Sequence, residues 1–267
     1  MSLTLTSLGG AGTVTGSRHL LEYKGQRLLI DCGLFQGYKA LRERNWAAFP
    51  IDPKSIDAIV LTHAHIDHSG YLPKLVREGY RGPVYCSSAT KDLCEILLRD
   101  SAYINERDAE RANRYRYTKH KHAEPLYTVA DAELALKQLA PIDFHQDVHL
   151  AIGADIHLRR AGHILGASTV EVRWGGKTIV FSGDLGRYGD PFMFDPEPVT
   201  AADYVVVEST YGNRTHPKID PMEQLGEVID RTVKRGGTVI IPSFAVGRAQ
   251  LILYHIWMLK KAGRFES

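Results

Sequence analysis

Short hydrophobic runs, separated by glycine and polar residues, give the first part of the chain the pattern of a β-sheet. Residues 3–8, 19–23 and 27–31 each predict a strand, and the pair Lys24-Gly25 predicts the turn between the last two. The apolar run at residues 57–62 predicts a further short strand. We therefore expect hairpins at the N-terminus, followed by a buried strand.

The middle of the chain changes to helical periodicity and then returns to strands. Apolar residues recur at helical spacing over residues 71–78, 90–99 and 108–116. Thr128 and Asp131 have the spacing of a capping box that opens a helix through residue 139. Strands are predicted at residues 148–152, 155–159, 169–174 and 177–182, and a Gly175-Gly176 turn joins the last two. Together these segments predict an α/β fold.

Strands and helices alternate beyond the strand that is predicted at residues 204–208. Residues 221–235 have the pattern of a helix, 238–242 that of a strand, and 246–261 that of a long amphipathic helix. Such alternation is typical of a parallel α/β unit. We therefore expect one unit over residues 1–208 and a second over residues 209–267, which is still incomplete at Ser267.

The composition is that of a soluble globular protein, since 44% of the residues are hydrophobic and 24% are charged. The apolar runs are too short to cross a bilayer, and the N-terminus has no pattern of a secretory signal. Three cysteines without a CxxC pair indicate a cytoplasmic protein rather than a disulfide framework. The formal net charge of +2 predicts no general affinity for nucleic acid.

The segment LTHAHIDHSG places three histidines and an aspartate directly at the end of a predicted strand. His63 and His65 are two residues apart, so on extended backbone they point to the same side. Asp67 and His68 follow at an expected helix start, where the chain can turn back towards the same point. Zinc, iron and manganese all bind imidazole and carboxylate. A single histidine of this kind is also compatible with a satisfied or solvent-facing side chain, but the four residues together predict a metal site.

Two later loops offer further ligands. His163 lies in RAGHILGAS and Asp184 lies in FSGDLGR, and each loop follows a predicted strand. Alone, a histidine or aspartate in a glycine-rich loop is usually a turn residue. Their shared position at the ends of strands is typical of a site that is built on the rim of a sheet.

These motifs, together with LLIDCG, resemble those of the metallo-β-lactamase superfamily. The resemblance implies an α/β fold of the αββα sandwich type with two metal ions along one edge. It assigns six side chains to the metals: His63, His65 and His163 to one, Asp67 and His68 to the other, and Asp184 to both. Asp31 would bond the backbone of the ligand loop rather than a metal. The alternative for Asp31 is a simple turn residue at a strand end.

Three further stretches, GGAGTVTGSRHLL, VVVESTYGNRTH and IPSFAVGRAQ, resemble the β-CASP group of RNA-processing nucleases within that superfamily. By this resemblance, residues 1–208 are the metallo-β-lactamase domain and residues 209–267 begin an inserted β-CASP domain. Glu208 would be a catalytic acid; its alternative is a strand-end carboxylate that caps a loop. The group has two later histidine motifs, and neither His216, in a polar loop, nor His255, in a helical apolar run, is assigned to them.

The expected chemistry is phosphodiester hydrolysis by a hydroxide that two metal ions activate about 3.5–4 Å apart. The catalytic side chains would be Asp67, which orients the water, together with Asp184 and Glu208. Zinc is the expected metal, and manganese stays open at one or both positions. The sequence contains no G-x-S-x-G motif or Cys/His arrangement that would supply a protein nucleophile.

Two features are candidates for contact with RNA. Residues 111–122 (RANRYRYTKHKH) carry five lysines and arginines with Tyr115 and Tyr117 between them, although a charged helix is usually a solvated face. Ser243 and Arg248 lie where a predicted strand turns into a helix, which predicts a site for a substrate phosphate. The alternative there is an ordinary turn with Ser243 as the N-cap.

Three functions follow from these observations. The first is a ribonuclease that acts on RNA, with single-stranded DNA as an open alternative, and a version that carries the part beyond Ser267 is expected to degrade RNA. The second is another hydrolase of this fold that acts on a small ester or phosphodiester, and the third is a non-catalytic RNA-binding subunit. Homodimers are common in the resembled group, but no segment of the sequence predicts an interface.

Overall fold

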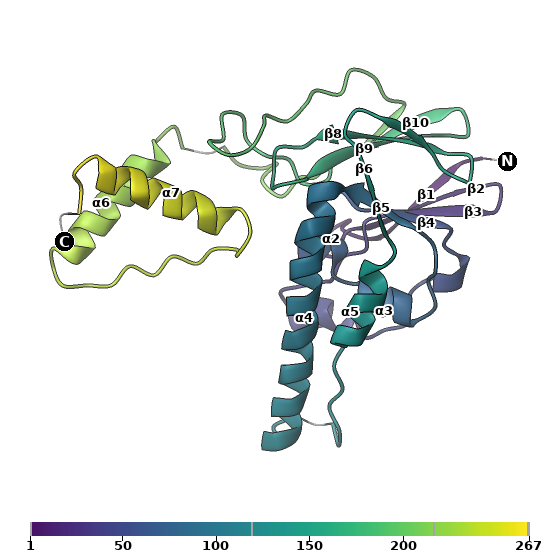
Figure 1. The fold of residues 1–267 in the computed structure, drawn as a ribbon, viewed down its shortest axis with the longest axis horizontal. Helices are drawn as coiled ribbons and strands as arrows, with labels where there is room; N and C mark the ends of the chain where they lie inside the picture. The colour runs from purple at the N-terminus through teal and green to yellow at the C-terminus, as the bar shows by residue number, and fades with distance from the viewer. Residues whose placement is uncertain (1, 119, 216, 266–267) are drawn as a thin grey trace.

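The computed structural model describes residues 2–118, 120–215 and 217–265, and most of them build two stacked β-sheets with helices on one side (Figure 1). The first sheet has the strand order β1 (Thr4–Gly9), β2 (Arg18–Tyr23), β3 (Gln26–Ile30), β4 (Ala58–Val60), β5 (Val84–Ser87) and β6 (Leu139–Ile142). The first three strands are antiparallel neighbours, and the pairings from β3 to β6 are parallel.

The second sheet runs in the order β11 (Tyr204–Val206), β10 (Lys177–Phe181), β9 (Ser168–Trp174), β8 (Asp155–Arg160) and β7 (Asp147–His149). All of its pairings are antiparallel except that of β10 with β11. The Gly175-Gly176 turn joins β9 and β10 as the sequence predicts.

The core lies in two layers, and the alternation of side chains along the strands of the first sheet separates them. Leu28 and Ile30 of β3 face the second sheet, where they pack in one apolar cluster with Val170 and Val172. Leu29, between them, packs on the opposite face, beneath the helices. Both faces of β3 are therefore buried, which explains its unbroken apolar sequence.

The helical layer covers the outer face of the first sheet. It contains α1 (Lys39–Glu43), a 3₁₀ turn (Pro53–Ser55), α2 (Ile66–Ser69), α3 (Leu72–Arg77), α4 (Ser88–Tyr115) and α5 (Val129–Leu136). The predicted capping box is present at α5, where the Thr128 side chain and the Asp131 side chain each bond the other's backbone. The two helical segments predicted at residues 90–99 and 108–116 are one continuous helix of 28 residues, α4.

The C-terminal part contains α6 (Pro221–Val233) and α7 (Arg248–Lys261), which pack on each other outside the two sheets (Figure 1). Tyr254 of α7 contacts Phe192, with 4.9 Å between the ring centres. The strand predicted at residues 238–242 is wrong, because this segment is irregular and Ile240 is 86% exposed. A strand requires a neighbour to bond its backbone, and no described residue pairs with this segment. No helix among the described residues is both long and apolar enough to span a bilayer.

Candidate metal centre

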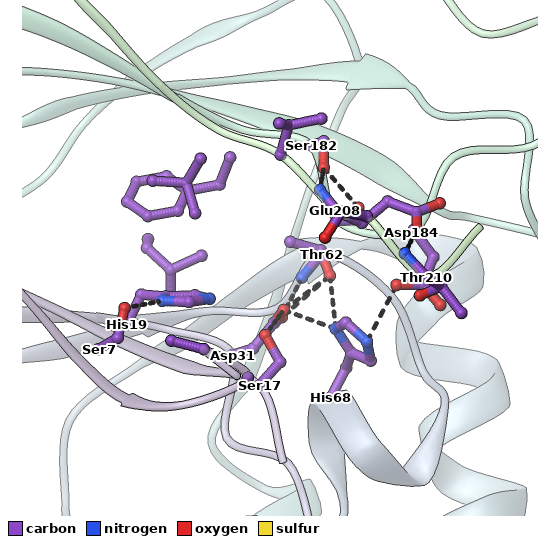
Figure 2. A pocket seen from close by; sticks show the side chains of 18 of the residues that line it. Ser7, Ser17, His19, Asp31, Thr62, His68, Ser182, Asp184, Glu208 and Thr210 are labelled. Atoms are coloured by element: carbon purple, nitrogen blue, oxygen red, sulfur yellow. Dashed lines mark hydrogen bonds and ion pairs between the residues drawn. The ribbon is translucent and has the colours of Figure 1, made fainter. Parts of the chain in front are cut away.

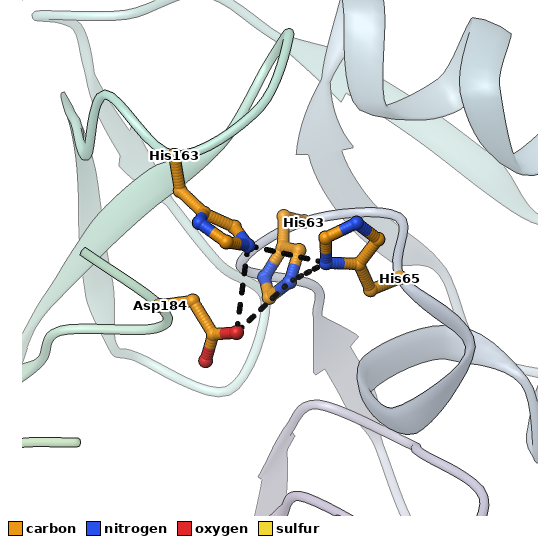
Figure 3. A group of neighbouring side chains, drawn as sticks. All are labelled: His63, His65, His163 and Asp184. Atoms are coloured by element: carbon orange, nitrogen blue, oxygen red, sulfur yellow. Dashed lines mark hydrogen bonds and ion pairs between the residues drawn. The ribbon is translucent and has the colours of Figure 1, made fainter. Parts of the chain in front are cut away.

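Loops at the carboxyl ends of strands from both sheets meet at one edge of the sandwich (Figure 3). His63 and His65 follow β4 of the first sheet, whereas His163 and Asp184 follow β8 and β10 of the second. One ligand atom from each of these four residues lies within 4.8 Å of the others. The structure thus brings together residues that the sequence separates by more than a hundred positions.

The distances inside this cluster suit a metal ion. His65 Nδ1 lies 3.1 Å from His63 Nε2 and 3.2 Å from His163 Nε2. Asp184 Oδ2 lies 3.8 Å from His63 Nε2 and 3.5 Å from His163 Nε2. Ligand atoms of a tetrahedral site with bonds of 2.0–2.1 Å are roughly 3.3 Å apart, close to these separations. The cluster therefore has the size and the nitrogen and oxygen donors that a divalent metal ion requires.

Burial keeps the three imidazoles of the cluster neutral. It is the main cause that holds the pKa of His63 well below its ordinary value, and the neighbouring His68 and His65 lower that pKa further. Burial likewise lowers the pKa of His65 to about 4 and lowers the pKa of His163. A neutral imidazole has a free lone pair on one nitrogen. These rings can therefore bind a metal ion without first losing a proton.

Hydrogen bonds fix the orientation of the buried His63 ring. The Thr62 hydroxyl lies 3.0 Å from both oxygens of the Asp31 carboxylate, which can only accept. The hydroxyl proton therefore points to Asp31, and His63 Nδ1, at 3.0 Å from the same hydroxyl, is the donor. The lone pair of His63 consequently lies on Nε2, the atom that faces the cluster.

Asp184 also faces a second group of ligands, on the side away from the three histidines. Its Oδ1 lies 3.2 Å from His68 Nε2, while its Oδ2 faces His63 and His163. Asp67 Oδ2 is 3.9 Å from the same nitrogen of His68. The six residues that the sequence predicts as ligands are thus close together, with Asp184 between the two groups.

Burial and neighbouring charges set the protonation of His68, Asp184 and Asp67 in this second group. Burial opposes the charged form of His68, but Asp31 and Asp184 outweigh it and hold the pKa of His68 well above its ordinary value. Burial also acts against the charge of Asp184, yet the neighbouring His68 and His163 lower the pKa of this carboxyl. For Asp67 burial dominates and raises the pKa.

Asp31 lies behind the ligands rather than among them, at the end of β3. Its Oδ1 accepts the backbone N–H of Thr62 at 2.8 Å, and its Oδ2 accepts Nδ1–H of His68 at 2.7 Å and the Ser17 hydroxyl at 3.1 Å (Figure 2). Thr62 is a positioning residue that the sequence analysis missed. Its only signal in the sequence is a hydroxyl residue directly before the first ligand.

Two glycines allow neighbouring loops of the site to approach each other closely. Gly183 has a φ of +56°, and a Cβ there would lie 2.8 Å from Cβ of Thr62. A Cβ on Gly162, next to His163, would lie 2.7 Å from the Phe194 carbonyl. A side chain at either position would push apart the loops that carry the ligands.

A cavity of about 470 Å³ opens beside His68 and Asp184 (Figure 2). The glycine-rich loop at residues 10–14 lines one side, and Glu208 and Thr210 line another. Glu208 is held by backbone donors, since its two oxygens accept N–H groups of Leu185 at 3.4 Å and Thr210 at 3.1 Å. It is therefore both a loop cap and part of the cavity wall.

The two residues predicted to bind a substrate phosphate, Ser243 and Arg248, lie at the start of α7, where Arg248 is the first helical residue. The N-cap of α7 is Gly247, with a φ of +89°, and not Ser243, which is exposed four residues earlier. Arg248 is close enough to His163 to lower the pKa of that ring. The ring of Phe244 lies 6.1 Å from the ring of His65, so this segment borders the histidine cluster.

The basic segment lies away from the cluster. Its described residues, 111–118 and 120–122, lie at and beyond the C-terminal end of α4 (Figure 1). His255 lies within α7, 6.0 Å from the ring of Tyr254, and His216 lies outside the described residues.

Comparison with known proteins agrees with this geometry. A family model described as the metallo-beta-lactamase superfamily matches residues 12–213. Ribonuclease TTHA0252 of Thermus thermophilus is 42% identical over 257 residues, which cover 96% of this chain and 55% of that protein. Endoribonuclease YSH1 of Saccharomyces cerevisiae is 32% identical over 94% of this chain and 32% of its own length. Transcription termination factor FttA of Methanosarcina mazei is 34% identical over 93% of this chain and 38% of its own length.

The chain spans about half of the first relative and about a third of the other two. Two of these relatives are named as ribonucleases, which confirms the resemblance to RNA-processing nucleases. The superfamily match covers most of the chain and contains all six converging side chains. The two sheets and the ligand-bearing loops at their shared edge are accordingly those of a known fold, and the chain belongs to the metallo-beta-lactamase superfamily.

Proposed function

We propose that the protein is a metal-dependent ribonuclease that hydrolyses phosphodiester bonds of RNA, with two zinc ions as its cofactors. The observation that carries this proposal is the position of Asp184, whose two oxygens face two different groups of ligands. The names of the ribonuclease relatives support RNA as the substrate class. The histidine-rich donor set favours zinc, and manganese is the alternative.

Each ligand has a separate task in this proposal. His63, His65 and His163 would hold one ion through the nitrogens that already converge. Asp67 and His68 would hold the other, and Asp184 would set the spacing between the two. Asp31 would keep the His68 ring in place through the bond to Nδ1.

When bound, such a pair of ions supplies an ionised water as nucleophile and stabilises negative charge on the phosphoryl group. The protein's own contribution is position and proton transfer. Burial raises the pKa of Asp67, which makes its carboxylate a better proton acceptor beside the attacking water. Glu208 would contact the substrate from the wall of the cavity, which is large enough to take a nucleotide-sized group.

We further propose that residues 1–208 form the metallo-β-lactamase domain and that residues 209–267 begin a β-CASP domain. The packing of α6 on α7, outside the two sheets, supports this division. Phe244 beside His65 supports a second domain that borders the metal centre. The three unpaired cysteines support a cytoplasmic location.

The test is RNA cleavage by the purified full-length protein, loaded with zinc or with manganese. We expect cleavage of single-stranded RNA, and a loss of more than about 100-fold for His65→Ala. His149→Ala is the matched control, since this exposed histidine pairs only with Asp155 among the described residues and should cleave like the wild type. Intact RNA after incubation with wild-type protein that holds both metals would disprove the proposal, and cleavage of single-stranded DNA alone would correct the substrate.

A further inference from the structure

We propose that the far end of α4 is a second RNA-binding surface, separate from the metal centre. We call this surface the α4 tip; it consists of the described residues within 107–122. The inference rests on the proposed function, because it assigns the tip to a more distant part of the same RNA. Contact would be made through phosphates and unpaired bases rather than through any base sequence.

The direction of α4 connects the tip to the metal centre. At its N-terminal end, the Thr90 hydroxyl donates to the carbonyl of Gly166 at 2.9 Å, in the loop that carries His163. The helix has 28 residues and is therefore about 42 Å long. It extends past the sheets and α5, so that the tip projects from the body of the protein (Figure 1).

The tip has a defined structure although it projects. Asn113 donates to the carbonyl of Ala123 at 2.9 Å and accepts the N–H of the same residue at 2.7 Å. Ala109 and Ala112 are buried. Arg116, with a φ of 51°, ends the helix in the left-handed conformation and starts the return. Arg111, Arg114 and Arg116 therefore project from an anchored helix end, which reduces the entropy that binding costs.

The charges at the tip differ from those along the rest of α4. Closer to the sheets, Arg99 contacts Glu133, and Arg107 at the edge of the tip pairs with Glu110 at 3.0 Å. Within the described part of the chain, no carboxylate pairs with the four exposed basic residues Arg111, Arg114, Arg116 and Lys121. An ordinary solvated helix face has partners of both signs. A group of cationic side chains without carboxylate partners favours binding of a polyanion.

Two aromatic side chains point to RNA rather than to an acidic protein. Tyr115 and Tyr117 are each 62% exposed. The guanidinium of Arg114 lies 5.5 Å from the centre of the Tyr115 ring. Exposed rings among cations are the arrangement that binds single-stranded nucleic acid, because each ring can stack on a base while the cations neutralise phosphates. The carboxylate side chains of an acidic protein have no flat ring on which the tyrosines could stack.

The first experiment compares two variants in full-length protein that carries His65→Ala to prevent cleavage. The test variant is Arg111→Gln/Arg114→Gln/Arg116→Gln. The control is Lys24→Gln/Arg42→Gln/Lys137→Gln, which removes the same charge from exposed positions outside the tip. An RNA that reaches along α4 needs on the order of a dozen stacked nucleotides, so we compare labelled RNAs of about 40 and about 6 nucleotides.

We expect the test variant to bind the longer RNA about tenfold more weakly than the control does, with no difference for the shorter one. The slope of log affinity against log salt should fall by about 2, since each phosphate contact contributes about 0.7 for a single strand. Equal binding of the longer RNA by the two variants would overturn the inference. A loss that is confined to a poly-glutamate probe would overturn it as well, in favour of an acidic protein.

A second experiment tests the rings. Tyr115→Leu/Tyr117→Leu should weaken binding of single-stranded RNA and leave a duplex of the same length unaffected, whereas equal effects on both would rule out stacking. The two proposals fail separately. If wild-type protein cleaves RNA but the tip variants bind it normally, only the α4 tip is wrong. If the tip binds RNA that no metal-loaded protein cleaves, only the ribonuclease proposal is wrong.

Discussion

The Asp31 carboxylate lies 2.7 Å from Nδ1 of His68 and thereby determines which nitrogen of that ring faces Asp184. The same carboxylate accepts the N–H of Thr62, the residue that precedes the first ligand. One side chain at the end of β3 therefore orients a histidine and holds the loop that starts at the end of β4. We expect its contribution to be visible in metal binding even though it touches no metal.

Asp31→Asn should weaken metal affinity by about 10- to 100-fold. Both carboxylate oxygens of Asp31 accept hydrogen bonds, from Thr62 and from His68, and the amide would put an NH₂ donor in the place of one of them. Asparagine tolerates the left-handed backbone of Asp31, with its φ of 61°, so the fold should survive. Competition with a zinc-binding dye measures the affinity. Asp52→Asn, at an exposed turn, is the control and should have no effect; an unchanged affinity for Asp31→Asn would contradict the role of Asp31.

Thr62→Val should destabilise the protein by about 1–3 kcal/mol, because it removes a fully buried hydroxyl and leaves its partners unsatisfied. Valine has nearly the same shape, so packing changes little. Urea denaturation of metal-free protein measures the loss. Thr62→Ser keeps the hydroxyl and should lose less stability than Thr62→Val; the reverse order would show that the methyl group matters more than the bonds to Asp31 and His63.

Gly183→Ala should lower metal binding in addition to straining the backbone. The new Cβ would lie 2.8 Å from Cβ of Thr62, at a φ of +56°. Gly176→Ala is the matched control, since its φ is +75° and nothing lies within 4 Å of the added atom. Both variants should lose about 1–2 kcal/mol of stability, because alanine is strained in the left-handed backbone conformation. Only Gly183→Ala should also lower the metal content, which elemental analysis measures; equal metal content in the two variants would contradict the close approach.

Acidification should destabilise the metal-free protein through the buried histidines. The pKa of His65 is lowered to about 4, below its ordinary value near 6.5, so the unfolded chain takes up this proton first. The contribution of His65 is complete above pH 6.5 and is lost as the pH falls towards 4. His65→Gln should therefore show a shallower fall in urea stability over this range than the wild type. Parallel curves for the two proteins would contradict the burial of a neutral ring.

The sequence predicts the convergence of the six candidate side chains better than it predicts the surroundings of the site. The spacing of His63, His65 and His68 carries local information, because two-residue and helical spacings place side chains in known directions. Most strands follow from their apolar patterns in the same way. The strands β5 and β6 were missed, since each has only four residues, and β6 contains a proline.

Other features depend on tertiary contacts. The alternative role of Ser243 as an N-cap is wrong, because Gly247 takes that position, where a Cβ would lie 3.1 Å from Ile164. Thr62 has no pattern in the sequence that distinguishes it from any other threonine in a strand. Its importance appears only when Asp31, thirty-one positions earlier, is placed beside it.

The origin of the ligands in both sheets has a mechanical consequence. His63 and His65 belong to the first sheet and His163 and Asp184 to the second, so an ion held by all four would cross-link the sandwich at this edge. The opposite edge would have no such link, and hydrogen exchange should therefore respond to metal removal at the ligand edge first. If the proposed pair of ions is bound, a sliding of one sheet on the other by a fraction of an ångström would change the spacing between the ions.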